Sequence, residues 1–321
     1  MGLADRAALA VLGSALTDQA RREDLTRDFY AFWFAADPGV RDLFPPDLAG
    51  QRMAVGQALG WVVEQLLARR ADAPVAFLAQ LGRDHRKHGA TREHYRAASR
   101  ALHRALRQNL ADRWTPRVDG AAAAVLSLVT EVMAGAAGGD EGPSAWSGTV
   151  LQHNRVARDI AVVRLMLDQP LPYHAGQYVS VEVPQCPRRW RYLSPAIPSD
   201  PGGFIEFHVR SVPGGLVSPA VVSETRPGDR WRLSAPHGGL HVDRDGSDVL
   251  MVAGSTGLAP LRALILEMAR FGDNPRVHLF FGARYPCELY DLNALWELAG
   301  RSPWLSVSPV SEFRADPPWA V

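Results

Sequence analysis

The sequence predicts a multidomain protein of the α + β + α/β class. It has an all-helical domain over residues 1–140, a small antiparallel β-barrel over 146–246 and a partial α/β nucleotide-binding domain over 247–321. Three features carry this prediction. Apolar residues recur at helical spacing up to residue 137, polar and apolar residues then alternate in short segments, and a glycine-rich turn follows an apolar run near residue 254. The Gly/Ser-containing stretch around residue 140 is expected to be a linker.

The composition excludes several classes of function. The 321 residues, 47% of them hydrophobic, are enough to bury two or three cores. Because the formal net charge is +1 and no long basic run occurs, we expect no nucleic-acid partner. Asp5 and Arg6 interrupt the mildly apolar N-terminus, and no apolar stretch approaches the roughly 20 residues of a membrane helix. We therefore expect a cytoplasmic protein with no membrane segment and no evident protein partner.

The two cysteines, Cys186 and Cys287, lie far apart in different segments, which argues against a disulfide framework. They also cannot hold an all-cysteine iron–sulfur cluster, which needs more thiolates than the chain has. Any electron transfer by this chain must therefore use other cofactors.

The helical half is expected to contain six helices with short connections. Its prolines fall only at plausible helix boundaries, and Thr91 is a plausible N-cap. His85 stands late on one of these helices, before Gly89 breaks the chain, so its ring can point between helices. A lone histidine in such a place is more often a surface or core residue than a ligand. The helices are expected near residues 3–20, 21–36, 51–70, 74–88, 92–111 and 118–137.

The company of His85 changes this interpretation: Phe29 and Tyr30 form an aromatic pair, Asp37 and Pro38 a corner, and Phe44, Gln51 and Val55 follow before it. In these residues the helical half resembles the globin domain of the flavohaemoglobins. The family's aromatic pair, proline corner, distal glutamine and proximal histidine recur here at matching spacing. His85 follows Gln51 by 34 residues, and Tyr95 follows His85 by ten. The resemblance is carried by Phe29, Tyr30, Asp37, Pro38, Phe44, Gln51, Val55, His85 and Tyr95.

The resemblance implies a globin-like fold that binds haem b, with the imidazole of His85 as the iron ligand. Dioxygen bound to haem iron carries partial negative charge, so the phenol of Tyr30 and the amide of Gln51 are expected to donate hydrogen bonds to it. Phe44 is expected to pack against the porphyrin, and Val55 to limit the space on the same side.

The proximal side departs from the family in one respect. Tyr95 matches the proximal tyrosine, but Ala134 aligns near the place of a glutamate that bonds with the histidine and the tyrosine. Glu131, one helical turn earlier, is a candidate substitute, and the alternative is that no acid is present. Without such an acid, His85 has less anionic character, and the electron donation that favours oxygen activation weakens.

Residues 146–246 are expected to form about six short strands between Gly/Pro turns. This region resembles the flavin domain of the ferredoxin–NADP reductase superfamily, which flavohaemoglobins attach to their globin. The motif RRWRYLSPA implies that Arg191 meets the FAD pyrophosphate and that Ser194 bonds near the flavin N5. Leu193 stands where the family has a tyrosine that covers the flavin. Tyr192 is one residue away and so on the opposite strand face, which leaves the covering to Leu193.

Two further barrel segments match the flavin domain. One is AGQY, with Gln177 and Tyr178. The other is PGGLVS, whose Gly215, Val217 and Ser218 would let backbone N–H groups approach the FAD pyrophosphate. Taken alone, each glycine pair is equally well explained as a hairpin turn.

An apolar strand, a Gly-rich turn and an amphipathic helix follow from residue 248. The N–H groups and the positive dipole end at the start of the helix suit a diphosphate. The turn stands where the reductases bind nicotinamide nucleotide, through Gly254, Thr256, Gly257 and Pro260. Arg284 is expected either to pair with the 2'-phosphate of NADPH or to be an ion-paired residue at a strand end.

The nucleotide-binding region is short. Residues 247–321 are fewer than the roughly 100 to 150 that such a domain usually needs. The family's cysteine–glycine–proline strand end and C-terminal aromatic residue are not found in the sequence. We therefore expect a truncated domain without the last strands of its sheet, whose exposed parallel edges would favour aggregation.

These resemblances imply an oxidoreductase that passes electrons from NAD(P)H through FAD to haem and uses dioxygen to convert nitric oxide to nitrate. Two alternatives stay open. One is a haem globin that binds or senses dioxygen or nitric oxide beside a reductase part that does not work. The other is an NAD(P)H-dependent flavin or ferric reductase, whose activity would survive His85→Ala.

Overall fold

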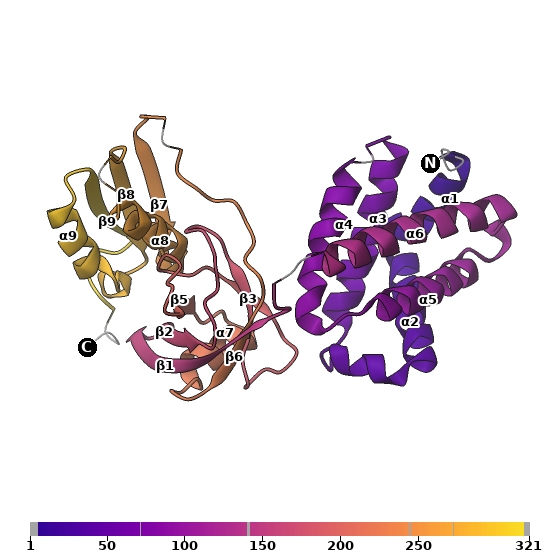
Figure 1. The fold of residues 1–321 in the computed structure, drawn as a ribbon, viewed down its shortest axis with the longest axis horizontal. Coiled ribbons are helices and arrows are strands. Elements are labelled where there is room, and N and C mark those ends of the chain that lie inside the picture. The colour runs from indigo at the N-terminus through magenta and orange to yellow at the C-terminus, as the bar shows by residue number, and fades with distance from the viewer. Residues whose placement is uncertain (1–5, 71, 140–141, 244, 272, 318–321) are drawn as a thin grey trace. The chain divides into compact units, whose positions relative to one another are not determined.

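The computed structural model of the protein describes residues 6–70, 72–139, 142–243, 245–271 and 273–317. The chain divides into two compact units, residues 1–144 and 145–321 (Figure 1). We call them the helical unit and the mixed unit and describe each by itself.

The helical unit contains the six predicted α-helices, which Figure 1 draws in indigo to magenta. Their ends differ from the predicted ones by a few residues; residues 1–5, where the first helix was expected to begin, lie outside the described residues. Short 3₁₀ helices cover Pro38–Leu43, Arg86–His88 and Ala111–Arg113. The α-helices are α1 (Arg6–Thr17), α2 (Gln19–Ala36), α3 (Ala49–Leu67), α4 (Asp72–His85), α5 (Arg92–Leu110) and α6 (Pro116–Gly138).

Side-chain caps explain where two of these helices begin. At the start of α2, Asp18 Oδ1 accepts a hydrogen bond from the backbone N of Arg21 at 2.9 Å. At the start of α5, Thr91 Oγ1 accepts from the backbone N of His94 at 3.3 Å, and His94 Nδ1 accepts from the backbone N of Thr91 at 3.1 Å. The predicted N-cap at Thr91 is confirmed.

Helices α4 and α6 approach each other at backbone distance where α4 carries Gly82. A Cβ atom on Gly82 would lie 2.3 Å from the carbonyl oxygen of Met133 and 2.7 Å from its Cα. Only glycine therefore permits this contact, which fixes the end of α4 against α6, three residues before His85.

Of the described helices, only α6 is long and apolar enough to cross a membrane. Its buried residues, among them Val118, Val125 and Met133, belong to the core of the helical unit. The expectation that no apolar stretch reaches such a length was wrong for this helix. Its larger apolar side chains lie in this core or pack against it, whereas Ala123 and Ala124 are exposed.

The mixed unit begins with the predicted antiparallel barrel of six strands, in the order β4-β3-β6-β1-β2-β5. An isolated antiparallel bridge between Pro195 and Phe207 joins the two ends of this order and nearly closes the barrel. A short helix, α7 (Val217–Ser223), lies between β5 and β6 in the sequence. The strands are β1 (Trp146–Ala157), β2 (Ile160–Leu167), β3 (Val179–Glu182), β4 (Arg191–Leu193), β5 (Phe204–Arg210) and β6 (Arg230–Leu233).

The rest of the mixed unit is the predicted small α/β part, a parallel sheet of order β7-β8-β9. Helices α8 and α9 cover one face of this sheet, where Met251 and Ala253 of β7 are buried with Leu295 of α9. On the other face, Leu250 and Val252 are 68% and 70% exposed. The elements are β7 (Val249–Gly254), α8 (Leu258–Met268), β8 (Val277–Ala283), α9 (Leu292–Arg301) and β9 (Leu305–Ser311), with 3₁₀ helices at Ser255–Gly257 and Pro286–Glu288.

Candidate functional site

The structure holds His85, the last residue of α4, in one tautomer. Its Nδ1 lies 2.6 Å from the carbonyl oxygen of Leu81. A carbonyl oxygen only accepts, so Nδ1 carries the ring proton and donates it, which leaves the lone pair of Nε2 for a metal ion. Burial lowers the pKa of His85 below its ordinary value, against the raising effects of the Leu81 hydrogen bond and the charge of Asp84. The ring is therefore neutral near pH 7, as iron ligation requires.

Tyr95, in the first turns of α5, lies beside this ring. The ring centroids of His85 and Tyr95 are 6.3 Å apart, and those of His85 and His88 are 6.0 Å apart. Tyr95 is 8% exposed, and its buried hydroxyl has no hydrogen-bond partner among the described residues. Burial raises the pKa of Tyr95 to about 12. A buried hydroxyl without a partner is uncommon in folded proteins, so this group is a candidate to meet a ligand.

Tyr30 of α2 lies at the centre of an aromatic cluster. Its ring is 5.4 Å from that of Phe44, in an edge-to-face arrangement, and 5.6 Å from that of Phe34. Tyr30 is 4% exposed, and burial raises its pKa well above the ordinary value, against a smaller effect of Arg52. Its hydroxyl makes no hydrogen bond to the described part of the chain. It is therefore a protonated, buried donor that is available to a ligand.

Gln51 and Val55 lie one helical turn apart at the start of α3, and both are half-buried. The structure thus places the predicted distal residues on α2, the corner before α3 and α3 itself. It places the predicted proximal residues on α4 and α5. This division between helices is the one that the globin resemblance requires.

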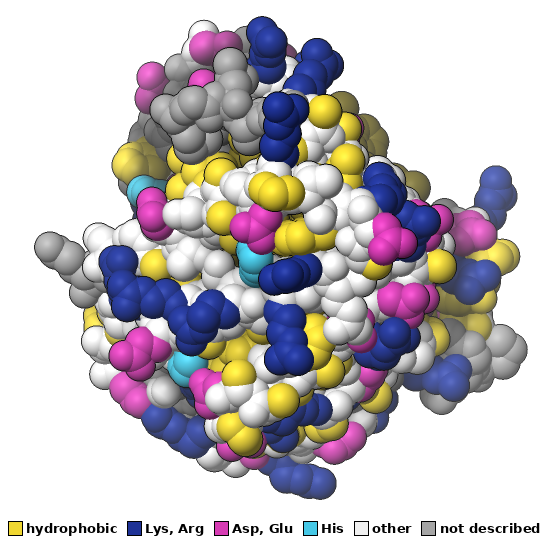
Figure 2. Space-filling model, turned by 90° about the vertical axis from the view of Figure 1, so that its right-hand side faces the viewer, with side chains coloured by type: hydrophobic (Ala, Val, Ile, Leu, Met, Phe, Trp, Pro, Cys, Tyr) yellow, Lys and Arg dark blue, Asp and Glu magenta, His cyan; other side chains and the backbone are white. Residues whose placement is uncertain are grey.

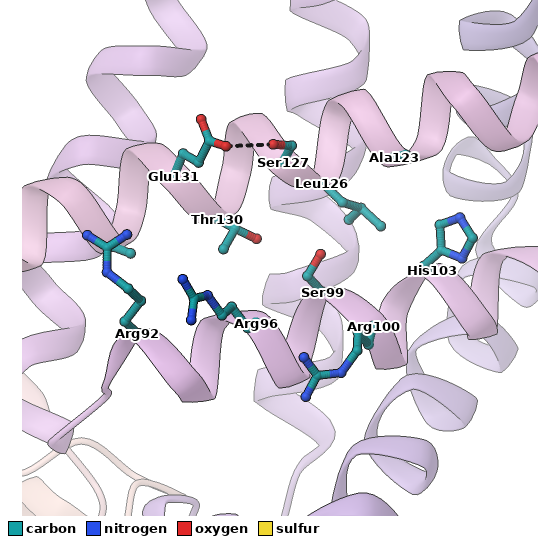
Figure 3. A pocket seen from close by; sticks show the side chains of 11 residues that line it. Arg92, Arg96, Ser99, Arg100, His103, Ala123, Leu126, Ser127, Thr130 and Glu131 are labelled. Carbon is teal, nitrogen blue, oxygen red and sulfur yellow. Dashed lines mark hydrogen bonds between the residues drawn. The ribbon is translucent and has the colours of Figure 1, made fainter.

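Glu131 does not act as the proximal acid in this structure. It is exposed on α6, where its Oε1 accepts a hydrogen bond from Ser127 at 2.9 Å. It is one of the residues around a groove of about 680 Å³ between α5 and α6, and in Figure 3 its carboxylate points to the side of α6 away from Arg92 and Arg96 of α5. The Tyr95 hydroxyl bonds to none of the described residues, and so not to Glu131. The physical reason is helical phase: Ala134, nearly one turn further on, is the buried residue of this pair.

On the face of the helical unit drawn in Figure 2, side chains of both charges are mixed. Figure 2, which faces this unit, shows Lys and Arg side chains spread over the surface with Asp and Glu side chains between them. This mixture agrees with the net charge of +1.

In the barrel, the motif around β4 presents Tyr192 rather than Leu193 to solvent. Leu193 is half-buried, pairs with the fully buried Val179 and packs against the barrel core. Tyr192 is 60% exposed, and its ring meets that of Tyr178 edge to face, with centroids 5.1 Å apart. Tyr192, which the sequence places on the strand face opposite Leu193, therefore presents an exposed ring that a flat cofactor can contact. A role for Leu193 in covering a flavin stays a prediction.

Two other predicted residues of this region shape its backbone. The side chain of Gln177 accepts from the backbone N of His174 at 2.9 Å and donates to the carbonyl of Gly238 at 3.2 Å. Gly238 has a φ of +88°, and a Cβ there would lie 2.9 Å from the ring of Tyr178. Gln177 and Gly238 therefore fix the position of Tyr178. Arg191 is exposed, with one donor on the carbonyl of Trp190 at 2.8 Å. Ser194 is half-buried just beyond β4.

The PGGLVS segment forms a turn before α7. Ser218 Oγ accepts from the backbone N of Val212 at 3.1 Å, and the backbone N of Gly215 donates to the carbonyl of Val212 at 2.9 Å. The side chain of Val217 is 2% exposed and belongs to the barrel core, so any cofactor contact of Val217 must come from its backbone.

The Gly-rich turn lies between β7 and α8, as predicted. A Cβ on Gly254 or Gly257 would have no atom within 4 Å, so the space over the turn is open to a ligand. Ser255 has a φ of +50°, and its hydroxyl accepts from Arg210 at 3.1 Å. Thr256 is half-buried in the turn, and Pro260 lies in the first turn of α8. This arrangement presents the N-terminus of α8 to a diphosphate.

Arg284 follows β8 and is exposed. Its guanidinium lies 3.7 Å from Glu312 and 5.8 Å from the ring centres of both Tyr285 and Phe313. The ion-paired alternative describes this position, and pairing with a 2'-phosphate stays a prediction. Cys186 and Cys287 are both free thiols, as expected.

The residues present fit the three groups that the sequence analysis named. A neutral imidazole with its proton on Nδ1 suits haem iron, and the buried hydroxyl of Tyr95 and the phenol of Tyr30, neither of which bonds to a described residue, suit a haem with a gaseous ligand. The exposed Tyr192 ring and Arg191 suit a flavin and its diphosphate. The open turn at Gly254 suits a nicotinamide nucleotide.

Known protein families match three consecutive parts of the chain. A globin family matches residues 27–133, an oxidoreductase FAD-binding domain matches residues 147–242, and an oxidoreductase NAD-binding domain matches residues 251–319. The first covers the proposed haem residues, and the other two cover the proposed flavin and nucleotide residues.

Two curated proteins are similar to the second half of the chain. The reductase component of phenol 2-monooxygenase from Pseudomonas sp. (strain CF600) is 36% identical over 159 residues, which is 49% of this chain and 45% of that protein. The reductase subunit of an aromatic O-demethylase from Amycolatopsis sp. is 35% identical over 176 residues, or 53% of this chain and 52% of that protein. The chain spans about half the length of these curated relatives.

Among solved structures, the crystal structure of a flavohaemoglobin from Malassezia yamatoensis with bound FAD and haem matches with a TM-score of 0.76. The match covers 97% of this chain and 85% of that chain at 18% sequence identity. At this identity the likeness shows a shared fold.

Proposed function

We propose that this chain, which joins a globin domain to FAD- and NAD-binding oxidoreductase domains in the fold of a flavohaemoglobin, is a nitric oxide dioxygenase. In this proposal electrons pass from NAD(P)H through FAD to haem, and dioxygen and nitric oxide become nitrate. The observation that carries it is a neutral His85 with an open Nε2, in a globin domain that shares one chain with a reductase.

In the globin domain, His85 would hold the haem through Nε2 while its Nδ1–H stays on the carbonyl of Leu81. Haem iron, when bound, supplies the site for dioxygen and accepts single electrons. Tyr30 keeps its proton at physiological pH because burial raises its pKa, so its hydroxyl donates a hydrogen bond to a partly negative ligand. Gln51 would offer an amide donor from α3, and the half-buried Phe44 and Val55 would keep water from the ligand.

In the reductase domains, Arg191 would bind the FAD diphosphate with its planar fork, and Tyr192 would lie against the flavin ring. The turn from Gly254 to Gly257 would admit the nicotinamide diphosphate to the start of α8. Ser194, next to β4, would donate a hydrogen bond near the flavin N5.

The test is an absorption spectrum of the purified full chain, with and without NADH under argon, followed by nitric oxide consumption in air. We expect a haem Soret band with flavin shoulders, reduction of the haem by NADH, and nitric oxide consumption that needs both NADH and dioxygen. His85→Ala should abolish haem binding, whereas the control His88→Ala, in the neighbouring ring, should retain it. A His85→Ala protein that keeps its Soret band overturns the proposal.

A second candidate is an NAD(P)H-dependent reductase that passes electrons to another acceptor. The observation in its favour is that the second half is 36% identical to a reductase component of a monooxygenase. Reduction of ferricyanide by NADH measures this activity without haem. If His85→Ala retains ferricyanide reduction and the wild type consumes no nitric oxide, the second candidate is correct.

A further inference from the structure

Strand β5 carries polar side chains on its outward face that are nevertheless covered. Ile205, Phe207 and Val209 point into the barrel and are 1%, 0% and 3% exposed. The alternate residues Glu206 and His208 are only 3% and 5% exposed. A strand with alternating polar residues usually faces water on that side, so another part of the mixed unit must cover this face.

The covering part is the α/β nucleotide-binding part. Tyr290 Oη lies 2.8 Å from His208 Nδ1, and His208 Nε2 lies 3.0 Å from Glu206 Oε1. Arg210, at the end of β5, donates to the hydroxyl of Ser255 in the Gly-rich turn at 3.1 Å. The outward face of β5 is therefore a polar contact between the flavin strand and the nucleotide turn.

Arg262 of α8 binds groups on both sides of this contact. Its NH1 donates to the carbonyl oxygen of Ala196 at 2.8 Å and lies 3.1 Å from Glu206 Oε1. Its Nε forms an ion pair with Asp291 Oδ2 at 2.8 Å. The Arg262 side chain is 16% exposed, so these contacts are made largely out of water.

The contact with Ala196 lies at the point where the barrel closes. The backbone N of Ala196 donates to the carbonyl of Glu206 at 2.8 Å, next to the bridge between Pro195 and Phe207. Ala196 is two residues after Ser194, and Arg262 is two residues after Pro260. Arg262 therefore connects the strand end that would hold the flavin to the helix that would hold the nicotinamide nucleotide.

The charges around Glu206 indicate that it stays ionised. Burial by itself raises the pKa of Glu206, but hydrogen bonds from His208 and Arg164 and the charge of Arg262 together lower it to about 2. A buried carboxylate of this kind depends on its partners, because loss of one leaves charge without compensation. The contact is thus held by a fixed ionic group rather than by loose surface charges.

We infer that Arg262 is a positioning residue for hydride transfer, which holds the nucleotide turn and α8 in register with the flavin strand at Ala196. The inference rests on the proposed NAD(P)H and FAD chemistry. In that step a hydride, carrying two electrons and one proton, leaves the nicotinamide and joins the flavin, which becomes reduced as the nicotinamide becomes oxidised. Catalysis of this kind depends on the alignment of two bound groups, and a misplacement of about 1 Å costs roughly 100-fold in rate.

The test compares Arg262→Met and Arg262→Lys with a control, Arg276→Met, in the full chain. Arg276 pairs with Asp248 in the same part of the protein, but their side chains are 82% and 64% exposed and lie outside the contact. Stopped-flow absorbance at several NADH concentrations separates nucleotide affinity from the limiting rate of flavin reduction. We expect Arg262→Met to slow the limiting rate about 10- to 100-fold with affinity changed less than about threefold, and Arg262→Lys to restore part of the rate.

Hydrogen exchange of the protein without NADH supplies a readout that does not depend on activity. We expect the backbone N–H of Ala196 and the start of α8 to exchange faster in Arg262→Met and unchanged in Arg276→Met. If Arg262→Met is poorly folded, the variant Tyr290→Phe takes its place. It removes only the hydrogen bond to His208, so we expect a smaller decrease in the limiting rate of flavin reduction.

Two kinetic results overturn the inference. One is a limiting rate in Arg262→Met equal to that of Arg276→Met. The other is a loss that appears only as weaker nucleotide binding. If the wild type transfers no hydride from NADH to flavin, the proposed function fails, whereas unchanged exchange at Ala196 refutes the contact itself.

Discussion

The close approach of α4 and α6 at Gly82 predicts a large effect from adding one methyl group. In Gly82→Ala the new Cβ would lie 2.3 Å from the carbonyl oxygen of Met133, whereas real Cβ atoms essentially never come within 3.0 Å. One backbone must therefore move by at least about 0.7 Å. Overpacking of this kind costs about 1 to 3 kcal/mol.

The matched control is Gly135→Ala on α6, where a Cβ would have no atom within 4 Å. Both changes gain the helix propensity of alanine over glycine, about 1 kcal/mol, so their difference isolates the cost of the contact.

The assay is urea unfolding of the full chain without haem, followed by helical circular dichroism, and then haem titration. We expect Gly82→Ala to be about 1 to 3 kcal/mol less stable than Gly135→Ala. We also expect it to bind haem more weakly, because a displaced α4 moves His85. Equal unfolding midpoints for Gly82→Ala and Gly135→Ala would refute the reasoning, and so would normal haem affinity in a clearly destabilised Gly82→Ala.

Three further outcomes are expected. Glu206 has a pKa of 4.5 in an unfolded chain and about 2 when folded. Its contribution is therefore complete above pH 4.5 and is lost as the pH falls toward 2. Between pH 7 and pH 4 the free energy of unfolding of the wild type should fall by about 1 kcal/mol more than that of Glu206→Gln, and parallel curves in urea unfolding would contradict this. Tyr95→Phe should stabilise the haem-free protein by about 1 kcal/mol, because it removes a buried hydroxyl without a partner, and a lowered unfolding midpoint would contradict that. Gly254→Val suits its extended backbone, with a φ of −108°, and its Cβ would meet no atom within 4 Å. It should therefore keep the unfolding midpoint but weaken NADH binding about tenfold or more by fluorescence titration, unless no nucleotide approaches this turn.

The local features of the fold could be predicted from the sequence. The helix at residue 92 begins where Thr91 caps it, and the turn from Gly254 to Gly257 follows an apolar strand, because caps and turns depend on neighbouring residues. The position of His85 at the end of α4 was also predictable, since Gly89 follows with a φ of +74° that favours glycine.

Features that depend on tertiary register could not be predicted. The alternating polar residues Glu206, His208 and Arg210 predict that this face of their strand meets solvent. No neighbouring residue in the sequence indicates that α8 and Tyr290 cover it. The exposure of Tyr192 depends on which face of β4 meets the barrel core, a choice that shifts with a single residue. In the same way, the phase of α6 decided that Glu131 faces solvent, and spacing alone left that open.

The uncovered face of the three-stranded sheet affects the solubility of the purified chain. Leu250 and Val252 point outward from β7, and Val252 pairs with Phe280 of β8. Parallel sheets are ordinarily covered on both faces, whereas this face exposes a strip of apolar side chains to water. The purified chain should bind hydrophobic dyes, should be retained by hydrophobic resins, and should self-associate as its concentration rises. The double substitution Leu250→Thr and Val252→Thr should reduce this self-association without changing the Gly-rich turn.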